Sequence, residues 1–176
     1  MVPESLFAVT SADVATTSDE WYTPRWLFDA AGITFDTDVC APVDPGFRTC
    51  PARRYLTAVD DGLVTPWEGV VWCNPPYSRV RPWAERFAAH RNGLALVPGV
   101  RSFWVNVLLD TSDAICLLGD VRFGLPDGRT STLRSVSILA AAGQQATDAL
   151  HRVASADVCH GKGMAWVRSW IIPPAA

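Results

Sequence analysis

Residues 70–78, which read VVWCNPPYS, run from an apolar segment into an asparagine, two prolines, a tyrosine and a serine. The apolar residues predict a short buried strand at 69–73, and the prolines end it because proline lacks an N–H and fixes φ. A strand-ending turn accounts for the prolines. It does not account for the amide before them or the ring after them. The stretch therefore indicates both a core strand and a candidate site at its end.

Similar apolar runs predict further strands, with helical patterns between them. We expect strands at 33–40, 94–97, 114–118 and 136–140, and helices at 24–31, 82–91, 103–109 and 145–153. The first helix carries its own signals, with Thr23 as N-cap, Pro24 as first helical residue and Gly32 as the C-terminal stop. Residues 47–69 read as irregular. This alternation predicts an α/β fold, a mostly parallel sheet with helices on both faces.

Parallel sheets bind their ligands in the crevice at the carboxyl ends of the strands. Three of the predicted strands end in polar or turn-forming segments, at 38–42, 74–77 and 98–99. We therefore expect the functional site where these segments meet.

Composition excludes several other classes of protein. The 176 residues suit one domain, and 49 % of them are hydrophobic. No apolar run approaches the ~20 residues of a membrane span, and the start of the chain does not resemble a secretory signal. Five cysteines without C-x-x-C spacing read as reduced thiols, and we expect no metal site. These features predict a cytoplasmic protein with no membrane partner.

The charge is unevenly distributed along the chain. The net charge is −3, but residues 79–134 carry eight arginines against five acidic residues. Arginine is the side chain best suited to bidentate contacts with phosphates and bases. The segment is a candidate nucleic-acid surface, although charge alone also fits a solvated surface.

The chemistry of the opening stretch follows from its residue types. Rigid prolines hold the Asn74 side chain and the following carbonyl in one direction, so that two oxygens can accept both hydrogens of one NH2 group. An aromatic ring at Tyr77 can stack on the planar system that bears the amine. Acceptors on both hydrogens stabilise positive charge that develops as the amine attacks. The motif suits methylation of a planar amine by a sulfonium donor, without deciding which amine.

With these pieces in order, the sequence resembles the S-adenosylmethionine-dependent amino-methyltransferases, and within them the phage and prophage DNA N6-adenine methyltransferase (Dam-like) family. The resemblance covers roughly residues 18–140 and rests on EWYTP at 20–24, FDTDVCAP at 35–42, DDGL at 60–63 and WCNPPYS at 72–78. It implies a Rossmann-like methyltransferase sandwich, encoded by a phage or prophage and acting in the bacterial cytoplasm.

The resemblance also implies roles for individual residues. Asn74, Pro75, Pro76 and Tyr77 are expected to be catalytic and to hold and stack on an adenine flipped out of double-stranded DNA. S-adenosylmethionine is expected at Tyr22, Thr23, Pro24, Asp38, Ala41, Pro42, Asp61 and Asn74. DNA contacts are expected from Ser78, Arg79, Arg81, Arg101, Arg122, Arg129 and Arg134.

Two alternatives remain open on the sequence. The same four residues suit another planar amine, such as cytosine N4 or a protein glutamine. The loop at 40–44 lacks the glycines usual after a first cofactor strand, which also fits a non-catalytic protein that binds DNA or a host protein. We expect a flexible leader at 1–17, a methyltransferase domain at 18–143 and a C-terminal extension at 144–176 packed on or beside that domain.

Overall fold

The computed structural model describes residues 19–156 and 170–171, so the leader predicted at 1–17 lies outside the described residues. The helices are α1 (Arg25–Ala31), α2 (Val80–His90), α3 (Phe103–Thr111), α4 (Gln144–Ser155) and the short 3-10 helices η1 (Pro45–Phe47) and η2 (Tyr77–Arg79). The strands are β1 (Phe35–Asp38), β2 (Ala52–Tyr55), β3 (Val71–Cys73), β4 (Gly93–Pro98), β5 (Ala114–Leu118), β6 (Arg122–Gly124), β7 (Thr130–Thr132), β8 (Ser137–Ala142) and β9 (Trp170–Ile171).

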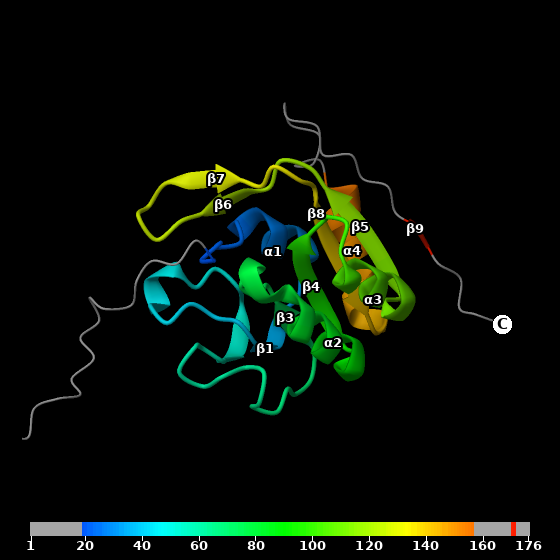
Figure 1. Ribbon diagram of the computed structural model, residues 1–176, viewed down its shortest axis with the longest axis horizontal. Helices are drawn as coiled ribbons and strands as arrows, with labels where there is room; N and C mark the ends of the chain where they lie inside the picture. The colour runs from blue at the N-terminus through cyan, green and yellow to red at the C-terminus, as the bar shows by residue number, and fades with distance from the viewer. Residues whose placement is uncertain (1–18, 157–169, 172–176) are drawn as a thin grey trace, which may run out of the picture.

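In this part of the chain, seven strands form one sheet in the order β2-β1-β3-β4-β8-β5-β9, and β6 pairs with β7 in a separate hairpin (Figure 1). The first four strands of that order are parallel, whereas β8 is antiparallel to both β4 and β5. Because β8 is antiparallel to both of these neighbours, β5 runs in the same direction as the first four strands of that order. The predicted α/β fold with a mostly parallel sheet is confirmed, and β8 with β9 supplies the antiparallel part.

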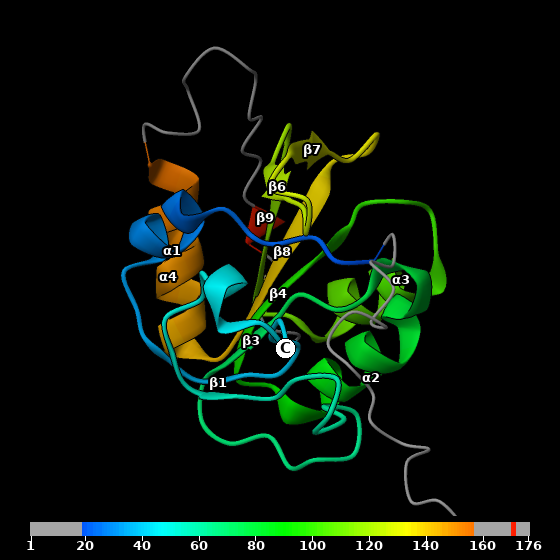
Figure 2. The ribbon, with the colours of Figure 1, turned by 90° about the vertical axis from the view of Figure 1, so that its left-hand side faces the viewer.

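Helices cover both faces of the sheet, as Figure 2 shows, with α1 and α4 on one side and α2 and α3 on the other. Along β4, Leu94 and Leu96 face the first pair of helices, and Ala95 and Val97 face the second. All four side chains are buried. Successive strand residues point to opposite faces, so a continuous apolar run is what a strand between two helical layers requires.

The structure corrects three predictions about local elements. Residues 47–69 are not wholly irregular, because β2 lies in them and pairs with β1. Its sequence, ARRY, shows no apolar run because β2 ends the sheet and exposes two arginines. Helix α2 begins at Val80, before the predicted start at 82. Thr23 does not cap α1: Pro24 is the N-cap residue, and the Thr23 hydroxyl accepts a hydrogen bond from Asn74 instead.

Helix α4 lies against α1 and buries Ala146, Ala149, Leu150 and Val153 in the core on that face of the sheet. The Arg152 side chain donates to the Ala31 carbonyl, with 2.8 Å between Nε and the oxygen. The wider division of the chain into leader, domain and extension stays a prediction. No helix among the described residues has both the length and the apolar character needed to cross a membrane.

Candidate active site

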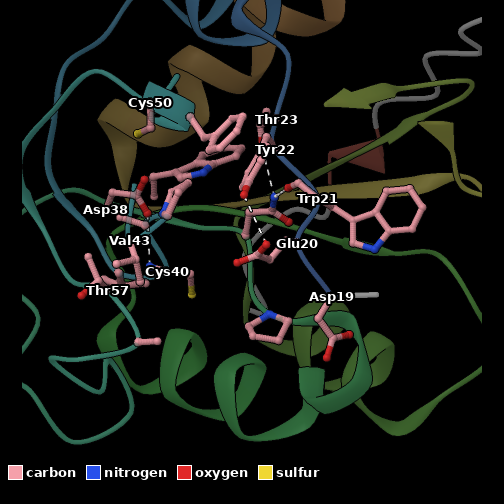
Figure 3. A pocket seen from close by; sticks show the side chains of 18 of the residues that line it. Asp19, Glu20, Trp21, Tyr22, Thr23, Asp38, Cys40, Val43, Cys50 and Thr57 are labelled. Carbon is pink, nitrogen blue, oxygen red and sulfur yellow. Dashed lines mark hydrogen bonds between the residues drawn. The ribbon is translucent and has the colours of Figure 1, made fainter. Parts of the chain in front are cut away.

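A cavity of about 410 Å³ opens at the carboxyl ends of β1 and β3. The chain passes from β1 to β2 on one side and then crosses to β3 on the other, so the strand order reverses at this point. Ligands of open α/β sheets bind at such a reversal. Figure 3 shows Asp38, Cys40 and Val43 on one side of the cavity and the segment Asp19–Thr23 on the other. We call residues 19–23 the N-terminal strap.

Most of the residues predicted to bind the cofactor come together here. Seven of the eight line the cavity, namely Tyr22, Thr23, Asp38, Ala41, Pro42, Asp61 and Asn74. Pro24, the N-cap residue of α1, does not. The loop after β1 is held without glycine: the buried Ala41 donates its N–H to the Leu56 carbonyl at 2.8 Å. Asp61, at φ 49°, accepts from the Leu63 N–H at 3.0 Å, as expected in a turn, and also borders the cavity.

Asp38 is the strongly perturbed acid of the site. It is 4 % exposed, and burial raises its pKa to about 7, although the Cys40 N–H, the Cys50 thiol and the Arg48 guanidinium each act to lower it. The Cys40 N–H donates to Oδ1 at 3.1 Å. Burial disfavours the ionised form of a carboxyl group, and a cationic partner restores that form. Asp38 is therefore suited to pair with a cation.

Asn74 follows β3 directly, and its amide is fixed in one orientation. Nδ2 donates to the Trp21 carbonyl at 2.7 Å and to the Thr23 hydroxyl at 3.1 Å. Oδ1 is buried and has no hydrogen-bond partner among the described residues. Buried polar atoms are normally paired, so an acceptor left without a donor beside a cavity is a feature of a binding site.

Tyr77 lies deeper than the sequence implied. Its ring stacks on Trp21, with centroids 6.1 Å apart and planes 20° apart, and meets Phe123 edge to face. Burial raises the pKa of its hydroxyl, which is also buried without a partner in the described part of the chain. Pro76 lines the cavity, whereas Tyr77 and Pro75 do not.

Sequence reasoning placed Tyr22 and Thr23 of the N-terminal strap at the cofactor, but it missed the contacts that hold the strap in place. Asp19 accepts from the Ser78 N–H at 2.9 Å and from its hydroxyl at 2.5 Å, so the predicted DNA-contacting serine binds the strap. Tyr22 exchanges two backbone hydrogen bonds of 2.9 Å with Gly124 of β6. These partners lie more than 50 residues along the chain, and no local pattern reveals them.

Other cavity residues carried only a packing signal in the sequence. Trp83 reads as the apolar face of α2, but it also lines the cavity, and a Cβ at Gly62 would lie 2.9 Å from its ring. Phe47 stacks on Tyr22, with centroids 4.7 Å apart. The close approach of Gly62 to the Trp83 ring indicates that the turn at 60–62 packs tightly against the side of the cavity that Trp83 forms.

The six arginines predicted to contact DNA are all exposed, and all lie at the carboxyl edge of the sheet. Arg79 and Arg81 follow β3, Arg101 follows β4, and Arg122, Arg129 and Arg134 lie between β5 and β8. Because these strand ends share one edge, topology gathers the arginines around residues 74–77, and we call this edge with its six arginines the arginine edge. Arg81 also pairs with Glu85 at 2.9 Å and lies over the ring of Phe103, which is 53 % exposed.

Comparison with known proteins adds a family to this geometry. A search of curated proteins found no match. The family model for DNA N-6-adenine-methyltransferase (Dam) matches residues 10–149, which include the N-terminal strap, the cavity and the arginine edge. Since the match covers most of the chain, this protein belongs to the Dam family of DNA N-6-adenine-methyltransferases and is a DNA adenine methyltransferase.

Proposed function

We propose that the chain binds S-adenosylmethionine in the cavity and methylates the N6 amine of an adenine flipped out of double-stranded DNA, with Asn74–Tyr77 holding the base. The observation that carries this proposal is the Asn74 side chain. Its Nδ2 is committed to the N-terminal strap and its Oδ1 is a buried acceptor without a donor. An exocyclic amine supplies the missing donor.

The residues present fit the cofactor. A volume of about 410 Å³ lies in the range of sites for small organic ligands. Asp38 is suited to the ammonium of the methionine part, and Asp61 to a hydrogen-bond donor such as an adenine amine. When bound, S-adenosylmethionine supplies a methyl group on a positively charged sulfur. Trp83 and Phe47 give the cavity aromatic walls, which exclude water and support planar groups.

The catalytic role of the protein side chains is electrostatic. The amine of adenine is a weak nucleophile, because its lone pair is delocalised into the ring. Oδ1 of Asn74 accepts one of its hydrogens and the carbonyl of Pro75 accepts the other. Both acceptors stabilise the positive charge that grows on the nitrogen as the bond to the methyl carbon forms. Pro76 keeps the two acceptors in a fixed relation.

The arginine edge supports a DNA substrate in duplex form. Phosphates on either side of a flipped nucleotide need cations around the catalytic motif, where topology places Arg79, Arg101, Arg122, Arg129 and Arg134. The β6–β7 hairpin carries or flanks three of these and contacts the N-terminal strap through Gly124. The hairpin therefore links the DNA surface to the site. Trp21 stacks on Tyr77, so a base that stacks on Tyr77 replaces or shifts the indole.

The family match favours adenine over cytosine N4 or a glutamine amide, which suit the same four residues. It also favours catalysis over a purely binding role. The lack of glycine in the loop after β1 does not weigh against a cofactor here, because Ala41 and Pro42 leave the cavity open.

Replacing Asn74 by alanine tests the proposal. Transfer of labelled methyl to duplex DNA, followed by digestion to nucleosides, should fall by about 100-fold or more, by analogy with loss of one transition-state hydrogen bond. Affinity for S-adenosylmethionine, measured by calorimetry, should change little. Asn92→Ala is the matched control, because Asn92 precedes β4 at the opposite edge of the sheet. Turnover by Asn74→Ala close to that of the control contradicts the catalytic assignment, and label in any nucleoside other than N6-methyl-2′-deoxyadenosine contradicts the substrate.

A further inference from the structure

The orientation of the Asn74 amide must be fixed by specific contacts. The oxygen and nitrogen of an asparagine amide are nearly the same size, so shape does not decide which way the group points. The orientation matters, because a flipped amide presents two donors to the target amine where an acceptor is required. Hydrogen-bond partners must therefore select the productive form.

The N-terminal strap supplies both partners. The Trp21 carbonyl accepts only, so the atom 2.7 Å from it must be the amide nitrogen. The Thr23 hydroxyl takes the second contact, with 3.1 Å between its oxygen and Nδ2. Between them, the two contacts engage Nδ2 and leave Oδ1 as the side-chain acceptor without a donor among the described residues.

Burial and backbone hydrogen bonds fix the position of Thr23. Its side chain is buried, at 3 % exposed. Its carbonyl accepts a hydrogen bond of 2.7 Å from the Thr49 hydroxyl. On its two sides lie Tyr22, bridged to Gly124, and Pro24, the N-cap of α1. The backbone that carries the hydroxyl is therefore held by contacts within the protein, which is the condition for preorganising a catalytic group.

We propose that Thr23 is a positioning residue for catalysis: its hydroxyl, together with the Trp21 carbonyl, holds the Asn74 amide with Oδ1 available to the target amine. The proposal rests on the proposed function of Asn74. It assigns Thr23 a role beyond the cofactor contact expected from the sequence, and it explains why a segment some 50 residues before the motif belongs to the active site. It also explains why position 74 carries an amide, since a carboxylate oxygen would meet the Trp21 carbonyl with no hydrogen between them.

Two variants separate the hydroxyl from the shape of Thr23. Thr23→Val keeps the volume and removes the acceptor, whereas Thr23→Ser keeps the hydroxyl. Thr37→Val is the matched control, because Thr37 is a buried threonine of β1 whose hydroxyl donates to the Glu68 carbonyl at 3.3 Å. We expect Thr23→Val to lower kcat about 5- to 10-fold, the value of one hydrogen bond, with a smaller effect on cofactor affinity. Thr23→Ser and Thr37→Val should keep kcat.

A second readout is independent of activity. The chain has three asparagines, Asn74, Asn92 and Asn106, so asparagine-selective ¹⁵N labelling gives three side-chain NH2 signals, and Asn74→Ala assigns one of them. In the unmodified chain, the Asn74 hydrogens should exchange with water more slowly than those of the exposed Asn106. In Thr23→Val, exchange at Asn74 should quicken about 5- to 10-fold.

Wild-type kcat in Thr23→Val overturns the proposal, as does an equal loss in Thr23→Ser or a loss confined to cofactor affinity. If Thr23→Val fails to fold, the unmodified chain still decides, because exchange at Asn74 as fast as at Asn106 also overturns it. The proposed function fails separately, through retained turnover of Asn74→Ala.

Discussion

Affinity for S-adenosylmethionine should fall as the pH drops below about 7, because Asp38 then stays protonated. Burial raises the pKa of this carboxyl to about 7 from an ordinary 3.8. An ammonium group pairs with the ionised form only, so binding in acid must first remove a proton. The neighbouring Cys50 thiol does not compete, since burial and Asp38 raise its pKa far above the neutral range.

The size of the effect follows from that pKa. Protonation of Asp38 by itself should make the dissociation constant about twice as large at pH 7 as at pH 8, roughly tenfold larger at pH 6 and about 100-fold larger at pH 5. At alkaline pH the ligand's own α-amino group, with a pKa of about 8, loses its proton. The tightest binding should therefore lie in a narrow range between about pH 7 and 8.

Titration calorimetry from pH 5 to 8 measures this dependence. Two controls isolate Asp38. 5′-Methylthioadenosine lacks the amino-acid part and should bind with little dependence on pH, and Asp38→Asn should lose the acid-side decline for the full cofactor. Equal affinity of the unmodified chain at pH 5 and pH 8 refutes the reasoning, and so does a slope of the same size with 5′-methylthioadenosine.

The same pKa acts with a definite sign on the ligand-free fold. Because the folded value lies above the unfolded value, the stability that protonated Asp38 contributes is full below about pH 4 and is lost as the pH rises through about 7. The shift corresponds to at most about 4 kcal/mol. Asp38→Asn should therefore be more stable than the unmodified chain at pH 8, as thermal unfolding measures, with the difference vanishing near pH 4.

Two further predictions concern packing and DNA. Gly62→Ala should destabilise the fold by about 1–3 kcal/mol, because its Cβ would lie 2.2 Å from the Val39 carbonyl oxygen; thermal unfolding measures this against Gly46→Ala, and equal stability of the two contradicts the packing. Arg122→Gln should reduce the slope of the logarithm of the DNA-binding constant against the logarithm of salt concentration by about one unit. Arg91→Gln is the control, because Arg91 lies before β4 at the opposite edge of the sheet, and it should leave the slope unchanged. Equal slopes for the two variants contradict DNA binding at the arginine edge.

The sequence alone predicted most of the sheet and a place for the site at its carboxyl edge. Strands such as β4 and β8 are buried on both faces, so they must be continuous apolar runs, and such runs are visible without any structure. The motif at 74–77 follows one of them, and the carboxyl-end rule then predicts where a ligand lies. Strand β2 was missed because an edge strand with exposed arginines has no such constraint, and β7 was missed because Thr130–Thr132 carries no apolar pattern.

Tertiary structure alone decided the contacts on which the proposed mechanism depends. That Asn74 presents its oxygen depends on Trp21 and Thr23, that Asp38 has a raised pKa depends on its burial, and that the arginines share one edge depends on the direction of β5. Each of these is a contact or a desolvation between segments far apart in the chain. Periodicity records which face of an element is buried, but hydrogen bonds and burial across such distances exist only once the chain has folded.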